Sequence, residues 1–153
     1  MGPIVRALIQ MGSSCSIQVL TGLVKIIRTP LVDDINGEIP RIISLLGSED
    51  LSTKVAAINC ILEIAFLGIE EVIGIMLEEH LIKKLMGVQR LEVGLQSNED
   101  EMEVWVASFV VQVEVGEGLE QSEKIAFKLE ILKRVREASV SDAEAATVVA
   151  EVL

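Results

Sequence analysis

The chain has 153 residues, of which 50% are hydrophobic, so it is long and apolar enough to bury one sizeable core. We therefore expect a single domain over residues 1–153. Its 13 basic and 24 acidic residues give a net charge of −11, which would repel a phosphate backbone and argues against a nucleic-acid partner. Aromatic residues make up only 3% of the chain, a composition that favours packed helices over sheets.

No stretch of the sequence has the length of a membrane span. The longest apolar stretches, such as residues 65–77 (AFLGIEEVIGIML), are interrupted by glutamate within about ten residues, whereas a helix needs roughly 20 to cross a bilayer. The first residues also lack the basic lead and long apolar region of a secretory signal. We expect a protein of the cytoplasm or the nucleus that does not bind membranes.

The residue types that carry chemistry are sparse. Cys15 and Cys60 are far apart and outside any CxxC spacing, so they predict buried, reduced thiols rather than a disulfide framework or a zinc site. His80 lies between two glutamates and has no serine or cysteine motif with which to form a catalytic triad. We expect no catalytic residue, no metal and no cofactor, and therefore no enzyme.

Short apolar segments recur along the chain at intervals of roughly 45 residues, a sign of a repeat protein. The chain opens with a partial copy over residues 2–14. The next begins at Pro40, directly after an Asn36-Gly37 turn, because proline is well tolerated in the first turn of a helix. Three copies share apolar residues at every third position: Ile39, Ile42 and Leu45; Ile82, Leu85 and Val88; Leu129, Leu132 and Val135.

Longer helices are predicted between the short ones, over residues 52–68, 98–116 and 141–153. The first ends at Gly68, which can adopt a left-handed cap. The second and third begin with capping-box spacings, Asn98 with Glu101 and Ser141 with Glu144. Residues 104–115 are rich in β-branched side chains and partly alternate, so a strand is the alternative for that segment.

Residues 36–68 resemble the armadillo repeat family. In that family a glycine, a one-residue gap and Ile-Pro open the second helix, as Gly37-Glu38-Ile39-Pro40 does here, and an Ala-rich third helix follows, as at Ala56-Ala57. The resemblance extends weakly over nearly the whole chain, although residues 82–88 lack the proline and residues 113–124 do not fit. It implies an all-α, right-handed armadillo-like α-solenoid of about three repeats, whose third helices line a concave surface.

Such a surface binds a peptide or a partner protein in the family. The residues predicted to face it are Asn59, Glu63, Trp105, Ser108, Gln112 and Glu151. Trp105 is the only tryptophan and would be the strongest anchor, unless it is a core residue, and the polar positions could equally form a solvated face. The importin-α branch uses a Trp and an Asn on each third helix, and that ladder is absent here.

The expected function is therefore non-enzymatic protein binding. The residue pattern of 37–65 most resembles that of plant proteins that join armadillo repeats to a U-box. This resemblance suggests substrate recruitment to a ubiquitin ligase, although these residues contain no U-box. The alternative is a self-associating structural helical-repeat protein, that is, a homo-oligomer. A mean hydropathy of +0.50 and repeat ends without polar caps favour that alternative.

Overall fold

The computed structural model describes residues 2–95, 105–138 and 146, and the regular secondary structure in these residues is entirely helical. The expected all-α class is thus confirmed for the part of the chain that is described. None of the helices there is both long and apolar enough to cross a bilayer. In chain order the α-helices are α1 (Gly2–Met11), α2 (Ser14–Ile27), α3 (Thr29–Ile35), α4 (Ile39–Ser44), α5 (Leu51–Phe66), α6 (Glu70–Glu78), α7 (Leu81–Leu95), α8 (Trp105–Val115) and α9 (Gln121–Ala138).

Helix α5 is the central helix, and both of its ends follow from local chemistry. At its start the Asp50 carboxylate accepts hydrogen bonds from the Ser52 backbone N–H (3.2 Å) and from the Thr53 hydroxyl (2.9 Å). A side-chain cap of this kind stabilises a helix by about 1 kcal/mol. At its end Gly68 has a φ of +67°, the left-handed conformation predicted from the sequence. Helix α4 likewise begins as predicted, with Pro40 in its first turn.

Helix α8 settles the choice between helix and strand for residues 105–115. This segment is α-helical and ends directly before Gly116, so the strand alternative is wrong there. Packing explains the result, because Phe109, Val110 and Val113 are all buried on one side of the helix. The predicted caps at Asn98 and Ser141 lie outside the described residues.

Two of the predicted short helices are in fact parts of longer ones. Residues 82–88 belong to α7, which has 15 residues, and residues 129–135 belong to α9, which has 18. Helix α9 begins early because the Glu123 carboxylate accepts a hydrogen bond from the Glu120 backbone N–H (3.0 Å) and so caps its first turn. The sequence pattern placed a repeated segment at residues 129–135 and did not predict this start.

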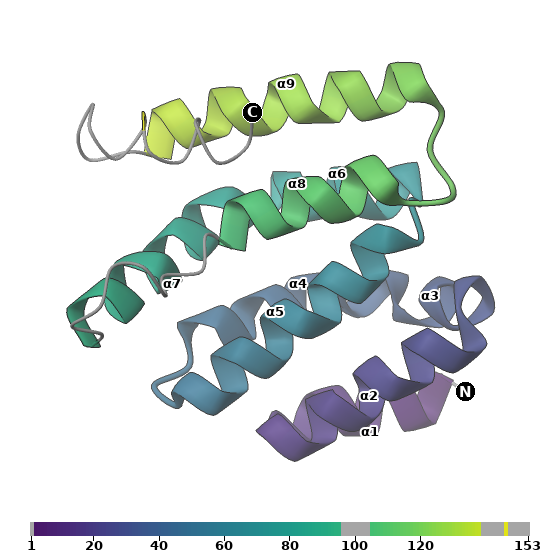
Figure 1. The fold of residues 1–153 in the computed structure, drawn as a ribbon. Helices are drawn as coiled ribbons and strands as arrows, with labels where there is room; N and C mark the ends of the chain where they lie inside the picture. Colours follow the sequence, from purple (N-terminus) through teal and green to yellow (C-terminus); the bar gives the residue numbers. More distant parts are fainter. Residues whose placement is uncertain (1, 96–104, 139–145, 147–153) are drawn as a thin grey trace.

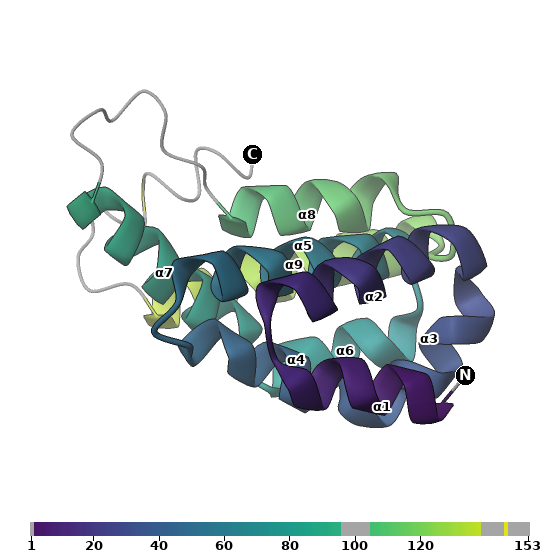
Figure 2. The same ribbon diagram turned by 90° about the horizontal axis from the view of Figure 1, so that it is seen from below.

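The long helices α2, α5 and α8 lie side by side, and we call them the long-helix wall (Figure 1). Seen from below, they form one layer, and α1, α4 and α6 form the layer behind it (Figure 2). The first member of the wall, α2, was not among the predicted long helices. It is equivalent to α5, because its buried residues Ile17, Leu20 and Val24 have buried counterparts 37 residues later.

A close backbone crossing holds α8 against α5. The Glu117 backbone N–H donates a hydrogen bond to the Phe66 carbonyl (3.1 Å) where the loop after α8 meets the end of α5. A Cβ atom on Gly116 would lie 2.7 Å from the Phe66 carbonyl oxygen, and one on Gly118 would lie 2.5 Å from the Leu67 and Gly68 carbonyl oxygens. Only glycine permits this approach, so these two glycines fix where the wall continues from α5 to α8.

Candidate functional site

The long-helix wall carries a groove of about 530 Å³. Three helices contribute to it: Gln18, Thr21, Gly22 and Lys25 come from α2, Ala56, Asn59, Leu62 and Glu63 from α5, and Gln112 from α8. Gly22 has no side chain and Ala56 has only a methyl group, so neither fills the space between α2 and α5. The groove therefore runs across three successive helices and does not lie within a single unit.

Amide side chains from each of the three helices line this groove. Gln18 and Asn59 are exposed, and Gln112 is half-buried. Each amide offers both a carbonyl acceptor and an N–H donor. Such a set can bind the N–H and C=O groups of another chain's backbone, because each backbone unit presents the same two functions.

One end of the groove is closed by an ion pair. The Lys25 ammonium lies 3.6 Å from the Glu63 carboxylate, and both side chains also line a second hollow of about 200 Å³. That hollow continues past Arg28, Phe66 and Glu117. Lys25 and Glu63 thus divide one longer depression into two parts. Their side chains are 59% and 35% exposed, so this ion pair can rearrange.

A second ion pair joins Arg28 to Glu117 at the far end of this depression. Arg28 has a φ of +65°, which is unusual for a residue with a side chain, and it marks the corner between α2 and α3. The two cations and two anions balance, so the depression has no net charge even though the whole chain carries −11.

Three of the predicted site residues come together in the structure. Asn59, Glu63 and Gln112 all line the groove. Ser108 is half-buried one turn earlier on α8 and is not one of the lining residues. Glu151 lies outside the described residues. The structure therefore brings Asn59, Glu63 and Gln112 together across α5 and α8.

The structure corrects the prediction that Trp105 faces a partner. Its side chain is only 5% exposed and belongs to the hydrophobic core, so it is not an anchor presented to a partner. It begins α8, where the residue equivalent in α5, Ala56, faces the previous helix. The core alternative considered for Trp105 is therefore the correct one.

The contribution of α2 to the groove was not predicted from the sequence. Gln18, Thr21 and Lys25 were not predicted as site residues because α2 was not recognised as a long helix. A signal was present at Ser13 and Ser16, whose hydroxyls each accept a hydrogen bond from the other residue's backbone N–H at 3.1 Å. This is a capping box with serine in the place of the usual glutamate.

The cysteines differ in environment, and only one matches the prediction. Cys60 is fully buried, and its burial raises the pKa of the thiol to about 12 although the Thr21 side chain hydrogen-bonds to it. A thiol of this kind stays protonated and is a poor nucleophile. Cys15 is exposed, so the expectation that it is buried is wrong. Among the described residues, no group of three or more His, Cys, Asp or Glu side chains could hold a metal ion.

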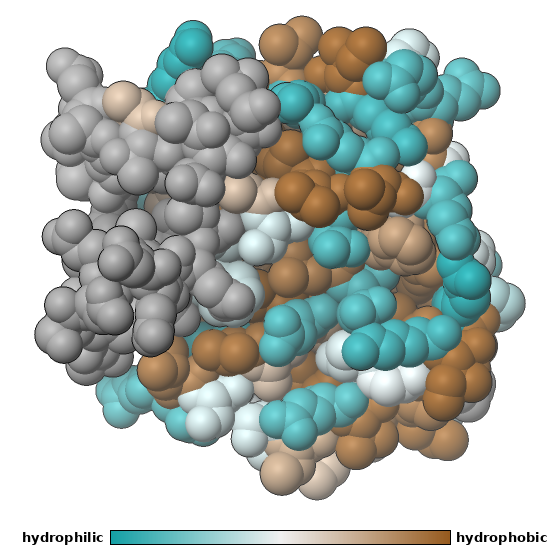
Figure 3. Space-filling view, viewed as in Figure 1, coloured by the Kyte–Doolittle hydropathy of each residue, from teal (hydrophilic) through white to brown (hydrophobic). Residues whose placement is uncertain are grey.

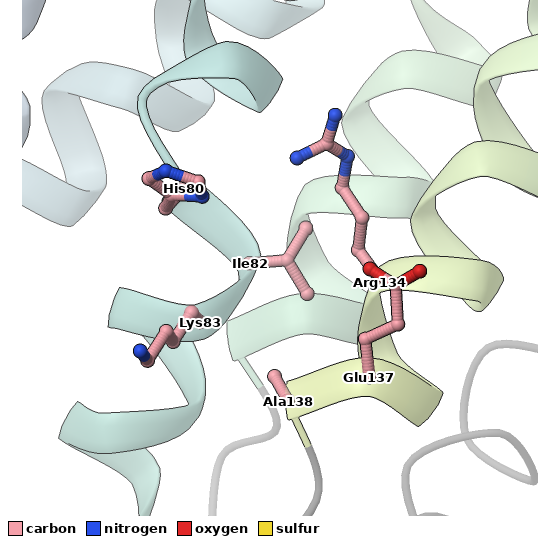
Figure 4. A pocket seen from close by; sticks show the side chains of 6 residues that line it. All are labelled: His80, Ile82, Lys83, Arg134, Glu137 and Ala138. Atoms are coloured by element: carbon pink, nitrogen blue, oxygen red, sulfur yellow. The ribbon is translucent and has the colours of Figure 1, made fainter.

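A smaller hollow of about 190 Å³ lies between the start of α7 and the end of α9 (Figure 4). His80, Lys83 and Arg134 line it, but Lys83 points away from α9 and these basic groups do not converge. The Arg134 guanidinium is already engaged, by the Leu77 carbonyl (2.8 Å) and the Glu130 carboxylate (3.0 Å). This hollow is therefore a poor anion site.

Comparisons of the chain with protein-family models, curated proteins and solved structures give no match.

Proposed function

We propose that the chain is a non-enzymatic interaction module that holds an extended peptide segment of a partner protein along the long-helix wall. The observation that carries this proposal is the groove into which Gln18, Asn59 and Gln112 open from three successive helices. In this proposal the helices form a right-handed armadillo-like solenoid, and the wall is its inner surface. The resemblance of residues 36–68 to armadillo repeats supports the same conclusion.

The spacing of the wall suits an extended chain. Packed helices lie about 8–10 Å apart, and an extended peptide advances about 3.3 Å per residue. Neighbouring amides of the groove would therefore contact backbone groups about three residues apart. Since each amide can donate and accept, Asn59 and Gln112 would bind the peptide backbone whatever its side chains are.

Charge narrows the class of partner. The groove and the adjoining hollow contain two cations and two anions, which favours a segment of low net charge. A nucleic acid is disfavoured by the net charge of −11. Recruitment of substrates to a ubiquitin ligase, the role suggested by the likeness to U-box-associated repeats, would use this same groove.

The test begins with a peptide selected for binding to the purified chain from a random display library, and measures its affinity by calorimetry. We expect Asn59→Ala and Gln112→Ala each to weaken binding about fivefold, since one hydrogen bond contributes about 1 kcal/mol. The double variant Glu63→Lys with Gln112→Ala should weaken it further while the helical circular dichroism stays unchanged.

Asn36→Ala is the matched control. Asn36 lies between α3 and α4, outside the groove, and its side-chain amide donates a long hydrogen bond (3.4 Å) to the exposed Glu71. The proposal is rejected if Asn36→Ala weakens the peptide as much as Asn59→Ala does, or if groove variants leave the affinity unchanged.

A further inference from the structure

The hollow of about 200 Å³ that adjoins the groove combines carboxylates with an aromatic ring. Glu63 and Glu117 line it together with the half-buried ring of Phe66, and Lys25 and Arg28 complete its charged rim. Figure 3 shows hydrophilic side chains on the right of the wall, where α2, α5 and α8 end. The hollow lies between these three helices and so belongs to the inside of the stack, not to either of its ends.

The helix ends around the hollow favour a positive charge. Arg28 directly follows α2, Phe66 is the last residue of α5, and Glu117 belongs to the loop that follows α8. The C-terminal end of a helix carries a partial negative charge of about half an elementary charge. These helix ends add to the carboxylates of Glu63 and Glu117, and the whole chain carries −11. A cation is therefore the preferred occupant of the hollow.

The chain already supplies one such cation from its own sequence. The Arg28 guanidinium pairs with the Glu117 carboxylate, although 89 residues separate the two. Their side chains are 46% and 58% exposed, and an ion pair with this exposure is weak. A cation brought by a bound chain can therefore replace Arg28 at Glu117 while the Arg28 side chain turns into solvent.

We propose that this hollow binds one arginine side chain of the segment that lies along the groove, in place of Arg28. The inference rests on the proposed function, because Lys25 and Glu63 line both the groove and the hollow. A guanidinium can form two parallel hydrogen bonds with a carboxylate and can stack on an aromatic ring, so it fits Glu117 and Phe66 better than a lysine ammonium does. The incoming arginine restores the charge balance that is lost when Arg28 leaves.

The position of the hollow also requires a long side chain. Arg28 and Phe66 each lie three residues beyond Lys25 and Glu63, which is about 4.5 Å along a helix axis. A backbone held by the amides of the groove thus lies on one side of the Lys25–Glu63 ion pair, and Glu117 lies on the other. An arginine side chain is long enough to pass this pair, whereas a short polar side chain would stop before it.

Calorimetry with the full chain and two matched peptides tests the inference. One peptide is the library-selected segment, in which we expect an arginine, and the other carries neutral citrulline at that position. Wild type should bind the arginine peptide about threefold more tightly. This ratio should rise to about tenfold in Arg28→Ala, because no internal cation then competes for Glu117, and should fall below about twofold in Glu117→Gln. Arg41→Ala is the matched control and should keep the wild-type ratio, since Arg41 pairs with Glu38 (3.4 Å) on the α4 side of the molecule.

Several outcomes would overturn the inference, and they differ from those that test the groove. If the citrulline peptide binds wild type as tightly as the arginine peptide while Asn59→Ala still weakens both, the hollow does not select a cation and the peptide-binding groove stands. If the selected peptides share no arginine, or if Arg28→Ala weakens the arginine peptide, Arg28 is not a competitor for this position. If Asn59→Ala leaves both affinities unchanged, the proposed function fails and this inference fails with it.

Discussion

The backbone crossing between α5 and the loop after α8 gives the sharpest stability prediction. In Gly118→Ala the new Cβ would lie 2.5 Å from the carbonyl oxygens of both Leu67 and Gly68, well inside van der Waals contact. Both obstructing atoms belong to the backbone, so neither can move away as the end of a flexible side chain could. The loop must therefore retreat from the end of α5.

The loss of stability can be estimated from the contacts that this movement of the loop breaks. Overpacking of this kind costs about 1–3 kcal/mol, and loss of the hydrogen bond from Glu117 to Phe66 adds about 1 kcal/mol. We expect the free energy of unfolding to fall by about 2–4 kcal/mol. For a chain of this size each kcal/mol corresponds to about 2–4 °C, so Tm should fall by roughly 5–15 °C.

Urea denaturation followed by circular dichroism measures this change. Gly74→Ala is the control, because Gly74 lies within α6 and a Cβ there meets nothing within 4 Å. That substitution should stabilise the chain by about 0.5–1 kcal/mol, since alanine favours a helix interior. The reasoning is refuted if Gly118→Ala is as stable as wild type, or if the two substitutions change stability in the same direction.

Two further predictions concern the thiols and an ion pair. Only Cys15 should react with a thiol reagent in the native chain, and Cys15→Ser should remove that reaction, whereas reaction of native Cys60 would contradict its burial. Because burial raises the pKa of Cys60 to about 12, its neutral form stabilises the fold fully below about pH 9, and this contribution is lost as the pH rises towards 12. Denaturant titrations of wild type should show that loss, and Cys60→Ala should show less of it. Glu117→Gln should lower the free energy of unfolding by less than about 1 kcal/mol at low salt and by nothing measurable in 1 M NaCl, because the ion pair of Glu117 with Arg28 is about half exposed. If the variant differs from wild type by the same amount at both salt levels, the pair is not screened as expected.

Local signals in the sequence were sufficient for the central unit. Pro40 and Gly68 act within one or two turns of the chain, and their roles in starting α4 and ending α5 were predicted correctly. The helix over residues 105–115 was also predicted, against its β-branched composition, because the repeat pattern outweighed local propensity.

The errors have two causes, one local and one that depends on packing between helices far apart in the chain. Helix α2 was overlooked because Ser13 and Ser16 form a cap without an acidic residue. Trp105 was predicted to lie on the surface. In the structure it is buried, because the face of α8 that carries it packs towards α5, and no short sequence pattern reveals that contact. Asn59 and Gln112 were nevertheless predicted together, since both follow from the helical period once α5 and α8 are aligned.

The central claim is that the long-helix wall is the binding surface for an extended peptide. Photo-crosslinking tests it most directly, with a benzophenone amino acid placed at Gln18, at Asn59 or at Ser44 and the library-selected peptide added. The account predicts crosslinks from positions 18 and 59, to peptide residues about three apart, and none from position 44 in the layer behind. Crosslinks from position 44 with none from 18 and 59 would contradict it.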